Sequence, residues 1–251
     1  PEQLSAAVTG KTRAVVINSP SNPTGVAYSS HELKDLVSVI ADKDILLITD
    51  DIYESIVYDG FRFSNVANIS DEIKKKTLVL NGVSKTYSMT GWRIGYMAGE
   101  ESIIKKVGTL QSQSTSNPCS IAQWAAIEAI SGDQGVVSTM LEAFTRRREL
   151  IINGLNEIDG VSCKKPDGAF YVFPTISDVY ALPGFAKVKE QFGDDNNSSN
   201  FSSYLLESCQ VAVVPGIAFG SDNQIRMSFA TSDDNINKGL ERIKDAVNKL
   251  K

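Results

Sequence analysis

The chain has 251 residues, of which 42% are hydrophobic and 22% charged, so it can bury a core large enough for one large domain or two small ones. Its formal net charge of −5 argues against a protein that binds nucleic acid or a membrane surface through clustered Lys and Arg. No apolar run reaches the roughly 20 residues of a membrane span, and no signal-peptide pattern is found, so we expect a soluble protein. The basic cluster Arg146-Arg147-Arg148 is interpreted as a solvent-exposed helix face.

Short apolar runs rich in β-branched residues alternate with helical patterns through the first half of the chain. Strands are predicted at Ala14–Asn18, Ile45–Thr49, Thr77–Asn81 and Ile94–Ala98, with a helix at Ser30–Ala41. Because hydrophobicity in these runs is continuous rather than alternating, we expect strands that are buried on both faces. This pattern predicts an α/β fold, with a mainly parallel sheet between two layers of helices.

Two long helical patterns, at Ile121–Ile130 and Gly135–Ile158, follow this region, and the second is too long for a simple crossover. Beyond it the sequence predicts a smaller α+β domain with strands at Phe170–Phe173, Val211–Val214 and Gln224–Phe229 and helices at Phe201–Ser208 and Asp234–Leu250. The polar run at residues 194–200 is interpreted as a mobile loop. The predicted division is therefore a large domain over residues 1–140, a linking helix over 141–158 and a small domain over 159–251.

Histidine and cysteine chemistry is disfavoured by the number and position of these residues. Cys119, Cys163 and Cys209 are far apart and lack CxxC spacing, so neither a disulfide framework nor a zinc site is indicated. We expect buried thiols in a reducing compartment and hence a cytoplasmic protein. The only histidine, His31, lies inside the helix start Ser29-x-x-Glu32, a position that disfavours a catalytic triad or a His-rich metal site. Any chemistry then belongs to Lys, Asp, Tyr or Arg.

Polar side chains follow the predicted strands of the first half, at the edge where ligands of α/β sheets gather. Asp50 ends the second strand, Tyr53 comes three residues later, and Lys85 follows the third strand. Lys85 is either a surface lysine on a loop or, with a lowered pKa, a former of Schiff bases. Asp50 is either a helix-capping residue or a ligand-binding carboxylate, and Tyr53 is either a core tyrosine or a phenol offered to the same site.

Two arginines are further candidates for binding an anion. Arg93 lies in Gly91-Trp92-Arg93-Ile94-Gly95-Tyr96, where the glycines allow close approach of a backbone, and it is either a phosphate clamp or half of a structural ion pair. Arg226 alternates with apolar residues in a predicted strand and shares a face with Gln224 and Ser228. It either pairs with a carboxylate of the protein or binds one from a ligand.

The order of these features closely resembles that in the aspartate aminotransferase family of class I, fold-type I pyridoxal-phosphate enzymes. The resemblance extends over essentially the whole chain and is carried by five ordered motifs: Asn22-Pro23-Thr24-Gly25; Asp50-x-x-Tyr53; Ser84-Lys85 with Met89-Thr90-Gly91-Trp92-Arg93-Ile94-Gly95-Tyr96; Asp167-Gly168-Ala169-Phe170-Tyr171; and Arg226-x-Ser228-Phe229. It implies that residues 1–140 are the C-terminal part of a cofactor-binding large domain.

The resemblance also implies roles around the pyridoxal-phosphate ring. Lys85 would hold the cofactor as a Schiff base and, once released by substrate, would carry the proton between substrate and cofactor. Asp50 would keep the pyridine nitrogen protonated, while Asn22 and Tyr53 would hydrogen-bond the phenolate oxygen. Ser84 is a candidate phosphate ligand.

Two arginine roles and one departure complete the resemblance. Arg93 would bind the cofactor phosphate, and Arg226, with Asn22, would bind the substrate, gripping its α-carboxylate through the two-pronged guanidinium. Many relatives carry a serine three residues before the lysine as a phosphate ligand, and this chain has Gly82 there. Ser84 either compensates for that serine or does not.

The expected reaction is a ping-pong transamination between an amino acid, with aspartate as the first expectation, and a 2-oxo acid such as 2-oxoglutarate. Aromatic amino acids, prephenate and alanine remain alternative specificities, and C–S lyase chemistry with the same cofactor is an alternative reaction. Because Pro1 opens directly into a helix-like stretch and family chains begin far upstream of it, we expect a fragment, too truncated to be fully active or even non-catalytic. A homodimer is expected of the full-length form.

Overall fold

The computed structural model describes residues 1–251, which fall into two compact units. Unit 1 comprises residues 1–21 and 26–140, and unit 2 comprises residues 22–25 and 141–251. The sequence predicts domains that follow one another along the chain. In the structure, the short segment 22–25 instead belongs to unit 2, while the residues on both sides of it belong to unit 1. The mixture of helices and a mixed sheet confirms the predicted α/β class.

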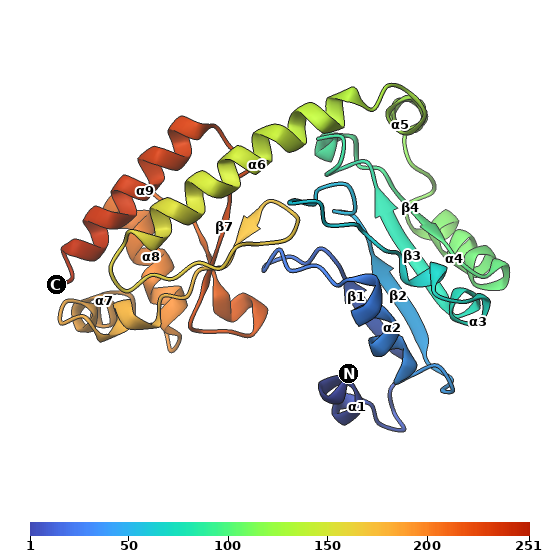
Figure 1. The fold of residues 1–251 in the computed structure, drawn as a ribbon, viewed down its shortest axis with the longest axis horizontal. Coiled ribbons are helices and arrows are strands. Elements are labelled where there is room, and N and C mark those ends of the chain that lie inside the picture. The colour runs from blue at the N-terminus through green and yellow to red at the C-terminus, as the bar shows by residue number, and fades with distance from the viewer. The chain divides into compact units, whose positions relative to one another are not determined.

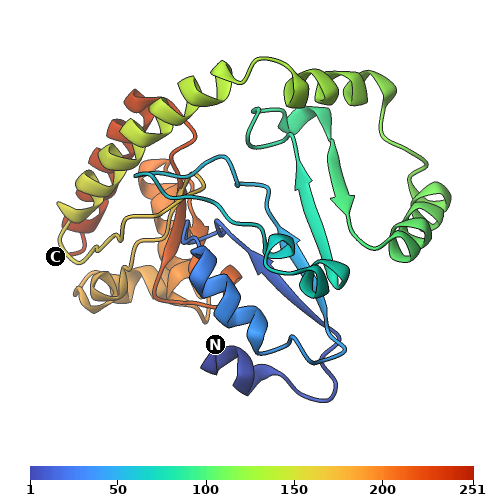
Figure 2. The same cartoon turned by 45° about the vertical axis from the view of Figure 1, so that its right-hand side comes forward.

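Unit 1 is built on a four-stranded sheet in the order β1-β2-β3-β4. Its strands are β1 (Ala14–Asn18), β2 (Leu46–Asp50), β3 (Thr77–Gly82) and β4 (Gly95–Ala98). The first three run parallel and β4 runs antiparallel to β3, as the arrows of Figures 1 and 2 show. In the register, Asn18 lies opposite Asp50, and Gly82 lies opposite Gly95. The carboxyl ends of three strands and the amino end of β4 thus share one edge.

The main core of unit 1 lies between the sheet and α2 (Ser30–Ser38), whose Leu33 and Val37 pack with residues of β1 and β2. This helix begins with the predicted capping box, because the Ser29 side chain accepts from the Glu32 amide and the Glu32 carboxylate accepts from the Ser29 amide. The remaining helices of the unit are α1 (Glu2–Ala7), η1 (Val66–Asn68), α3 (Asp71–Lys75), η2 (Thr90–Trp92), α4 (Glu101–Ser114) and α5 (Ser120–Ser131), followed by the start of α6 (Gly135–Asn156).

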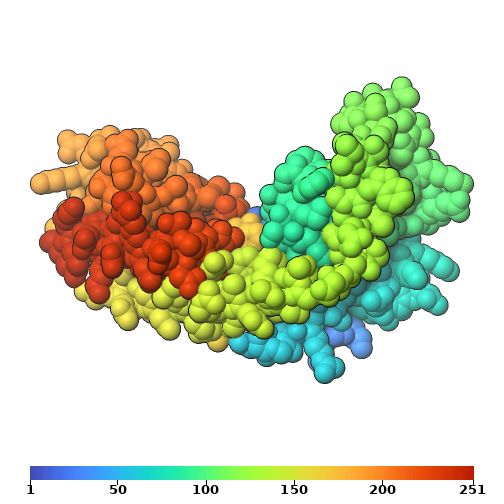
Figure 3. All heavy atoms as spheres, turned by 90° about the horizontal axis from the view of Figure 1, so that it is seen from above, coloured from blue at the N-terminus to red at the C-terminus, as the bar shows by residue number.

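Parts of unit 1 expose apolar side chains. Val16 in β1 is 66% exposed and β4 is mostly exposed, so the expectation of strands buried on both faces is wrong for these two edge strands. In α5 the alanines at 122 and 126 are buried, whereas Trp124 is 72% exposed in a stripe that repeats every three residues. The other members of the α5 stripe are Ile121, Ile127 and Ile130. In the space-filling view of Figure 3, the stretch that contains α4 and α5 is drawn in green, at the right.

Unit 2 combines a small antiparallel sheet, in the order β5-β7-β6, with long helices. Its elements are the greater part of α6, β5 (Tyr171–Val172), η3 (Ser177–Ala181), α7 (Phe185–Phe192), α8 (Asn197–Cys209), β6 (Val214–Pro215), η4 (Gly216–Phe219), β7 (Ile225–Ser228) and α9 (Asp233–Asn248). Phe185, Phe201 and Phe229 are fully buried in its core. Figures 1 and 2 both show α9 beside α6, and Arg146 and Arg147 of α6 both bind Asp233 at the start of α9.

Three predictions from local sequence are wrong. The run at 194–200 is not simply a loop, because α8 begins at Asn197 and the side chains of Ser198 and Asn200 are fully buried. Arg148 is also fully buried, unlike Arg146, so the basic cluster is not wholly a solvent-exposed face. Of the three cysteines, which are all free, Cys119 is exposed rather than buried.

None of the helices is long and apolar enough to cross a membrane.

Candidate active site

The edge of the unit 1 sheet brings together five of the predicted site residues. Asp50 is the last residue of β2, and the turn that follows it carries Tyr53. Ser84 and Lys85 follow the end of β3, and Arg93 precedes β4, which starts at this same edge because it runs antiparallel. The strand directions alone therefore gather an acid, a phenol, an amine and a guanidinium.

The turn after β2 is fixed by bonds to its own backbone and to β3. The Ile52 amide donates to Asp50 Oδ1 at 3.3 Å, and the Glu54 amide donates to the Asp51 carbonyl at 2.9 Å. The Asp51 amide donates to the Leu80 carbonyl at 2.9 Å, which extends the pairing with β3 by one residue beyond the strand. Tyr53 in this turn is buried, with 3% exposure.

A second carboxyl group, that of Asp51, lies buried behind this edge with 4% exposure. Its Oδ2 accepts from the hydroxyl of Thr49 at 3.4 Å and from the side-chain amide of Asn65. Burial, together with the negative charges of Glu54 and Asp50, raises the pKa of Asp51 to about 7. Asp51 is therefore largely protonated in mildly acidic solution.

The turn after β3 holds Lys85 and packs against α5. Val83 is fully buried in a cluster with Ile94 and with Ala122 and Ala126 of α5. Lys85 itself is partly buried, and its carbonyl accepts from the Ser88 amide at 3.2 Å. The inner face of α5 thus supports the segments that carry Lys85 and Arg93.

Arg93 differs from its neighbours in backbone conformation. It adopts a left-handed conformation with φ of 56°, and its Nη1 donates to the Thr90 carbonyl at 2.7 Å. A non-glycine residue at positive φ is uncommon and directs attention to function. The side chain is exposed and donates to backbone rather than to a carboxylate, so the ion-pair alternative is not supported.

The departure at Gly82 has a physical reason in this fold. A Cβ added to Gly82 would lie 2.8 Å from the Ile94 carbonyl oxygen and 3.2 Å from the Cδ1 of Ile52. The backbone that leads into β4 therefore occupies the space that a serine at this position would need. Ser84, which is partly buried two residues later, is the nearest hydroxyl before Lys85.

Unit 2 holds the other two predicted residues, Asn22 and Arg226, in contact with each other. Arg226 lies in β7, and its Nη1 donates to Asn22 Oδ1 at 3.0 Å. Its guanidinium carbon lies 4.7 Å from the ring centroid of Tyr171 and 5.3 Å from that of Phe219. Two aromatic rings and an amide thus orient the guanidinium without neutralising its charge.

Asn22 reaches this place because the segment 22–25 docks on the rest of unit 2. The Gly25 carbonyl accepts from the amides of Asp167 and Gly168 at 3.0 and 2.8 Å. Gly25 has φ of 69°, and a Cβ there would lie 2.4 Å from the Cβ of Pro166. Two motifs distant in sequence, at 22–25 and 167–171, therefore bind each other, and only glycine fits where they meet. The peptide bond before Pro23 is cis.

Three residues near the predicted set were not recognised as candidates from sequence. Phe219 contributes a ring to Arg226, but its chain position after a Gly-Ile-Ala run carries no signal that would identify it. Glu54 and Asn81 bond each other at 2.7 Å behind the edge of the sheet. Their position in the sequence could have identified them, because each lies within four residues of a predicted site residue.

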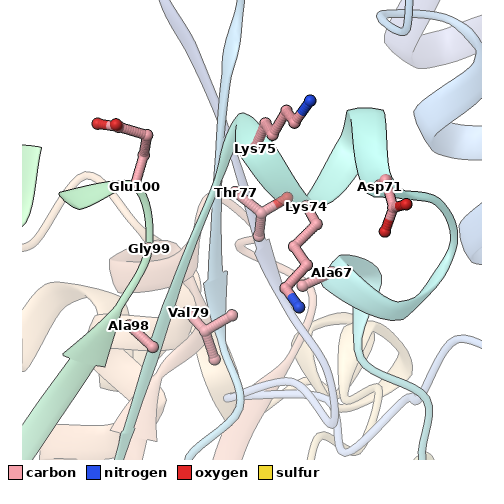
Figure 4. Close-up of a pocket in the computed structure, with 9 residues that line it drawn as sticks. All are labelled: Ala67, Asp71, Lys74, Lys75, Thr77, Val79, Ala98, Gly99 and Glu100. Atoms are coloured by element: carbon pink, nitrogen blue, oxygen red, sulfur yellow. The ribbon is translucent and has the colours of Figure 1, made fainter. Parts of the chain in front are cut away.

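A pocket of about 510 Å³ lies elsewhere on unit 1 and contains none of the predicted residues. Val79 and Ala98 line its apolar floor, and Figure 4 shows Lys74 reaching down beside Ala67 while Lys75 points the other way. The pocket includes Thr77, at the amino end of β3, so it lies near the edge of the sheet opposite to Lys85.

Comparison with known proteins gives a consistent family result. The sequence profile of the family described as "Aminotransferase class I and II" matches residues 1–243. An aspartate aminotransferase of Bacillus subtilis (strain 168) is 49% identical over 249 residues, which are 99% of this chain and 61% of the relative. An aspartate/prephenate aminotransferase of Cereibacter sphaeroides is 48% identical over 97% of this chain and 60% of the relative.

Solved structures give the same result. The crystal structure of an aspartate aminotransferase from Rhizobium meliloti superposes with a TM-score of 0.90 at 45% identity, covering 98% of this chain and 61% of that one. An aromatic aminotransferase from Pyrococcus horikoshii OT3 superposes with a TM-score of 0.89 at 34% identity, covering all of this chain and 64% of that one. This chain therefore spans about three fifths of the length of such relatives.

Proposed function

The chain belongs to the class I and II aminotransferase family, and from this premise we propose that it binds pyridoxal 5′-phosphate at the edge of the unit 1 sheet and serves transamination between an amino acid and a 2-oxo acid. The observation that carries the proposal is the convergence of Asp50, Lys85 and Arg93 at that edge. A carboxylate accepts from a protonated pyridine nitrogen, an amine reacts with an aldehyde, and a guanidinium donates to a phosphate, so the three groups match the cofactor.

The residues present fit the cofactor. Asp50 Oδ1 accepts one bond from the Ile52 amide, and a carboxylate has further acceptor positions for a pyridinium N–H. Lys85 supplies the amine for covalent attachment, Tyr53 a phenolic donor, and Ser84 and Arg93 the phosphate ligands. The left-handed backbone at Arg93 is consistent with a side chain that is placed for function rather than for packing. When bound, pyridoxal phosphate supplies an electron sink that stabilises negative charge on the substrate Cα.

In this proposal the chain's own groups bind the substrate and move a proton. Once the substrate's amino group has displaced it from the cofactor, the free Lys85 amine would accept the proton from the substrate Cα and give it to the C4′ carbon of the cofactor. Asp50 holds a proton at the ring nitrogen by its negative charge. Arg226, oriented by Asn22 and by the rings of Tyr171 and Phe219, binds the α-carboxylate of the substrate with two parallel N–H donors.

We propose aspartate as the amino-group donor and 2-oxoglutarate as an acceptor, with ping-pong kinetics, because the relatives at 48–49% identity are named for aspartate. One of them is also named for prephenate, and a structure at 34% identity is named for aromatic substrates. These acids share the α-carboxylate that Arg226 would bind and differ in the distal group. We also propose that the protein forms a homodimer, which the exposed apolar stripe of α5 supports. We further propose that it is located in the cytoplasm.

The test is chemical trapping at a single lysine. The purified chain is incubated with pyridoxal phosphate, reduced with borohydride, digested and mapped by mass spectrometry. Lys85→Arg is the matched control, because it keeps the positive charge but cannot form the bond to the aldehyde. A pyridoxyl adduct concentrated on Lys85 supports the proposal, whereas adducts spread over surface lysines, with Lys85 labelled no more than the others, refute it.

A second measurement separates transamination from lyase chemistry. Four assays are run in turn with the cofactor-loaded protein. The substrates are aspartate, phenylalanine, a cysteine thioether, and prephenate as acceptor with glutamate as donor. Transamination yields a 2-oxo acid and leaves the amino group on the cofactor, while a lyase releases ammonia and pyruvate. Release of ammonia at the rate of substrate loss would contradict the proposed reaction.

A further inference from the structure

Two residues outside the predicted set, Glu54 and Asn81, join the turn after β2 to the end of β3, which leads to Lys85. Asn81 Nδ2 donates to Glu54 Oε1 at 2.7 Å, and Asn81 Oδ1 accepts from the Gly82 amide, also at 2.7 Å. Both side chains are partly buried. The Asn81 amide group therefore donates to the turn after β2 and accepts from Gly82, the last residue of its own strand β3.

The bridge joins segments that are 27 residues apart in the chain. Glu54 directly follows Tyr53 and closes the turn after β2 through its amide bond to the Asp51 carbonyl. Gly82 is the last residue of β3 and lies three residues before Lys85. The Glu54–Asn81 bond thus links the Tyr53 turn to the end of β3, in addition to the strand pairing and the bond from the Asp51 amide to the Leu80 carbonyl.

The charge of Glu54 acts on groups from several segments around the sheet edge. Burial raises the pKa of Tyr87, which follows Lys85, and of Tyr96 in β4, and the negative charge of Glu54 raises both further. The same charge adds to the raised pKa of Asp51. A hydrogen bond to a charged acceptor in such partly buried surroundings is stronger than one between neutral groups, so it suits a positional role.

We propose that Glu54 and Asn81 are a positioning pair, which sets the Lys85 amine and the Tyr53 phenol at the separation that cofactor binding requires. The pair acts through the turns and touches neither cofactor nor substrate. The inference rests on the proposed function for the identity of the ligand, but the bridge itself can be tested without it.

The decisive experiment reverses the bridge. In the double variant Asn81→Asp with Glu54→Gln, the new amide at position 54 would donate to the new carboxylate at position 81, whose second oxygen would still accept from the Gly82 amide. In the single variant Asn81→Asp two carboxylates meet and the donor is lost. Glu54→Gln alone keeps an acceptor for Asn81 and removes only the charge, so it is the matched control.

The first readout is the initial rate of borohydride-trapped pyridoxyl labelling at Lys85, divided by the summed rate at the other lysines. We expect Asn81→Asp and Glu54→Ala to lower this ratio about tenfold or more, the effect of losing one charge-assisted hydrogen bond. Glu54→Gln should stay within about threefold of the native chain, and the double variant should recover most of the loss of Asn81→Asp. Thermal unfolding midpoints separate this effect from general destabilisation.

The second readout is hydrogen exchange of the Gly82 and Val83 amides in the cofactor-free chain. We expect faster exchange in Asn81→Asp and its reversal in the double variant. If the native chain shows no preference for Lys85 in labelling, the proposed function fails, and amide exchange alone then decides the bridge. If the double variant is no better than Asn81→Asp in both readouts, or Glu54→Ala labels and exchanges like the native chain, the positioning role is wrong.

Discussion

Replacing Asp51 by asparagine should stabilise unit 1 at neutral and alkaline pH. Asp51 is 4% exposed, and burial followed by the charges of Glu54 and Asp50 raises its pKa from 3.8 to about 7. Its Oδ2 accepts bonds from Thr49 and Asn65, and the oxygen of the new side-chain amide would accept the same bonds. The substitution therefore removes the ionisation and keeps the packing and the acceptor.

The sign and size of the effect follow from proton linkage. Because the folded-state pKa of this carboxyl is raised, the folded chain binds more protons than the unfolded chain between pH 3.8 and about 7. Its free energy of unfolding therefore falls as pH rises across this window, by at most about 1.4 kcal/mol per pH unit, and the loss is complete above the folded pKa. Between about pH 5 and about pH 8 the group contributes a loss on the order of 2–3 kcal/mol, which the Asp51→Asn variant lacks.

Urea unfolding at about pH 5 and about pH 8 measures this difference. Both tryptophans, Trp92 and Trp124, belong to unit 1, so fluorescence reports on the unit that contains Asp51. Asp44→Asn, at an exposed position of the same unit, is the control that removes a carboxylate without removing a buried one. Equal pH dependence in the native chain and in Asp51→Asn would show that Asp51 does not ionise in this range and would refute the reasoning.

Three further substitutions test packing and charge. Gly25→Ala should lower the free energy of unfolding of unit 2 by about 3 kcal/mol or more, because its Cβ would lie 2.4 Å from the Cβ of Pro166 and its φ is unfavourable for alanine. Gly60→Ala, where φ is similar but the new Cβ meets no atom, should lower the free energy of unfolding by only about 1 kcal/mol. In urea unfolding, Gly82→Ser should lower the free energy of unfolding by about 1–3 kcal/mol, because the new side chain meets the backbone that leads into β4. In the control Gly91→Ser the new Cβ meets no atom within 4 Å, so the free energy of unfolding should change by less than about 0.5 kcal/mol. Bonds from two α6 arginines lower the pKa of Asp233 to about 2, so Asp233→Asn should lower the thermal midpoint at neutral pH. That loss should vanish as pH falls through about 2, and it should shrink in high salt. A loss for Gly60→Ala equal to that for Gly25→Ala, or a salt-independent effect at Asp233, would contradict these expectations.

The strands and the edge of unit 1 were predictable because their causes are local. The run Ala14–Asn18 forms β1 with the predicted bounds, and the predicted start of α2 at Ser30 follows from its capping box. Parallel strand direction then places Asp50 and Lys85 at one edge with no further information. The roles assigned to Asn22, Arg93 and the other site residues stay predictions, since position alone does not test them.

What local sequence could not indicate depends on distant partners. The Asp222 carboxylate accepts from the amides of Asn197 and Ser198, 25 and 24 residues away, and so starts α8 within a run that is typical of a polar loop. Arg148 is fully buried because its Nη1 donates to the Pro166 carbonyl at 3.0 Å and its Nη2 to the Glu149 carboxylate. The helix start depends on a carboxylate about 25 residues away, and one of the two partners of Arg148 lies 18 residues away, so neighbouring residues do not indicate them.

The assignment of residues 22–25 to unit 2 also bears on the order of events during synthesis. Asn22 leaves the ribosome 204 residues before its partner Arg226, so the arginine's hydrogen bond cannot form until nearly all of unit 2 has been synthesised. Unit 1 has all its strands by residue 98 and can fold before segment 22–25 has a docking partner. A ribosome that stops anywhere between residues 98 and 226 thus releases a chain that has every strand of the unit 1 sheet but lacks Arg226.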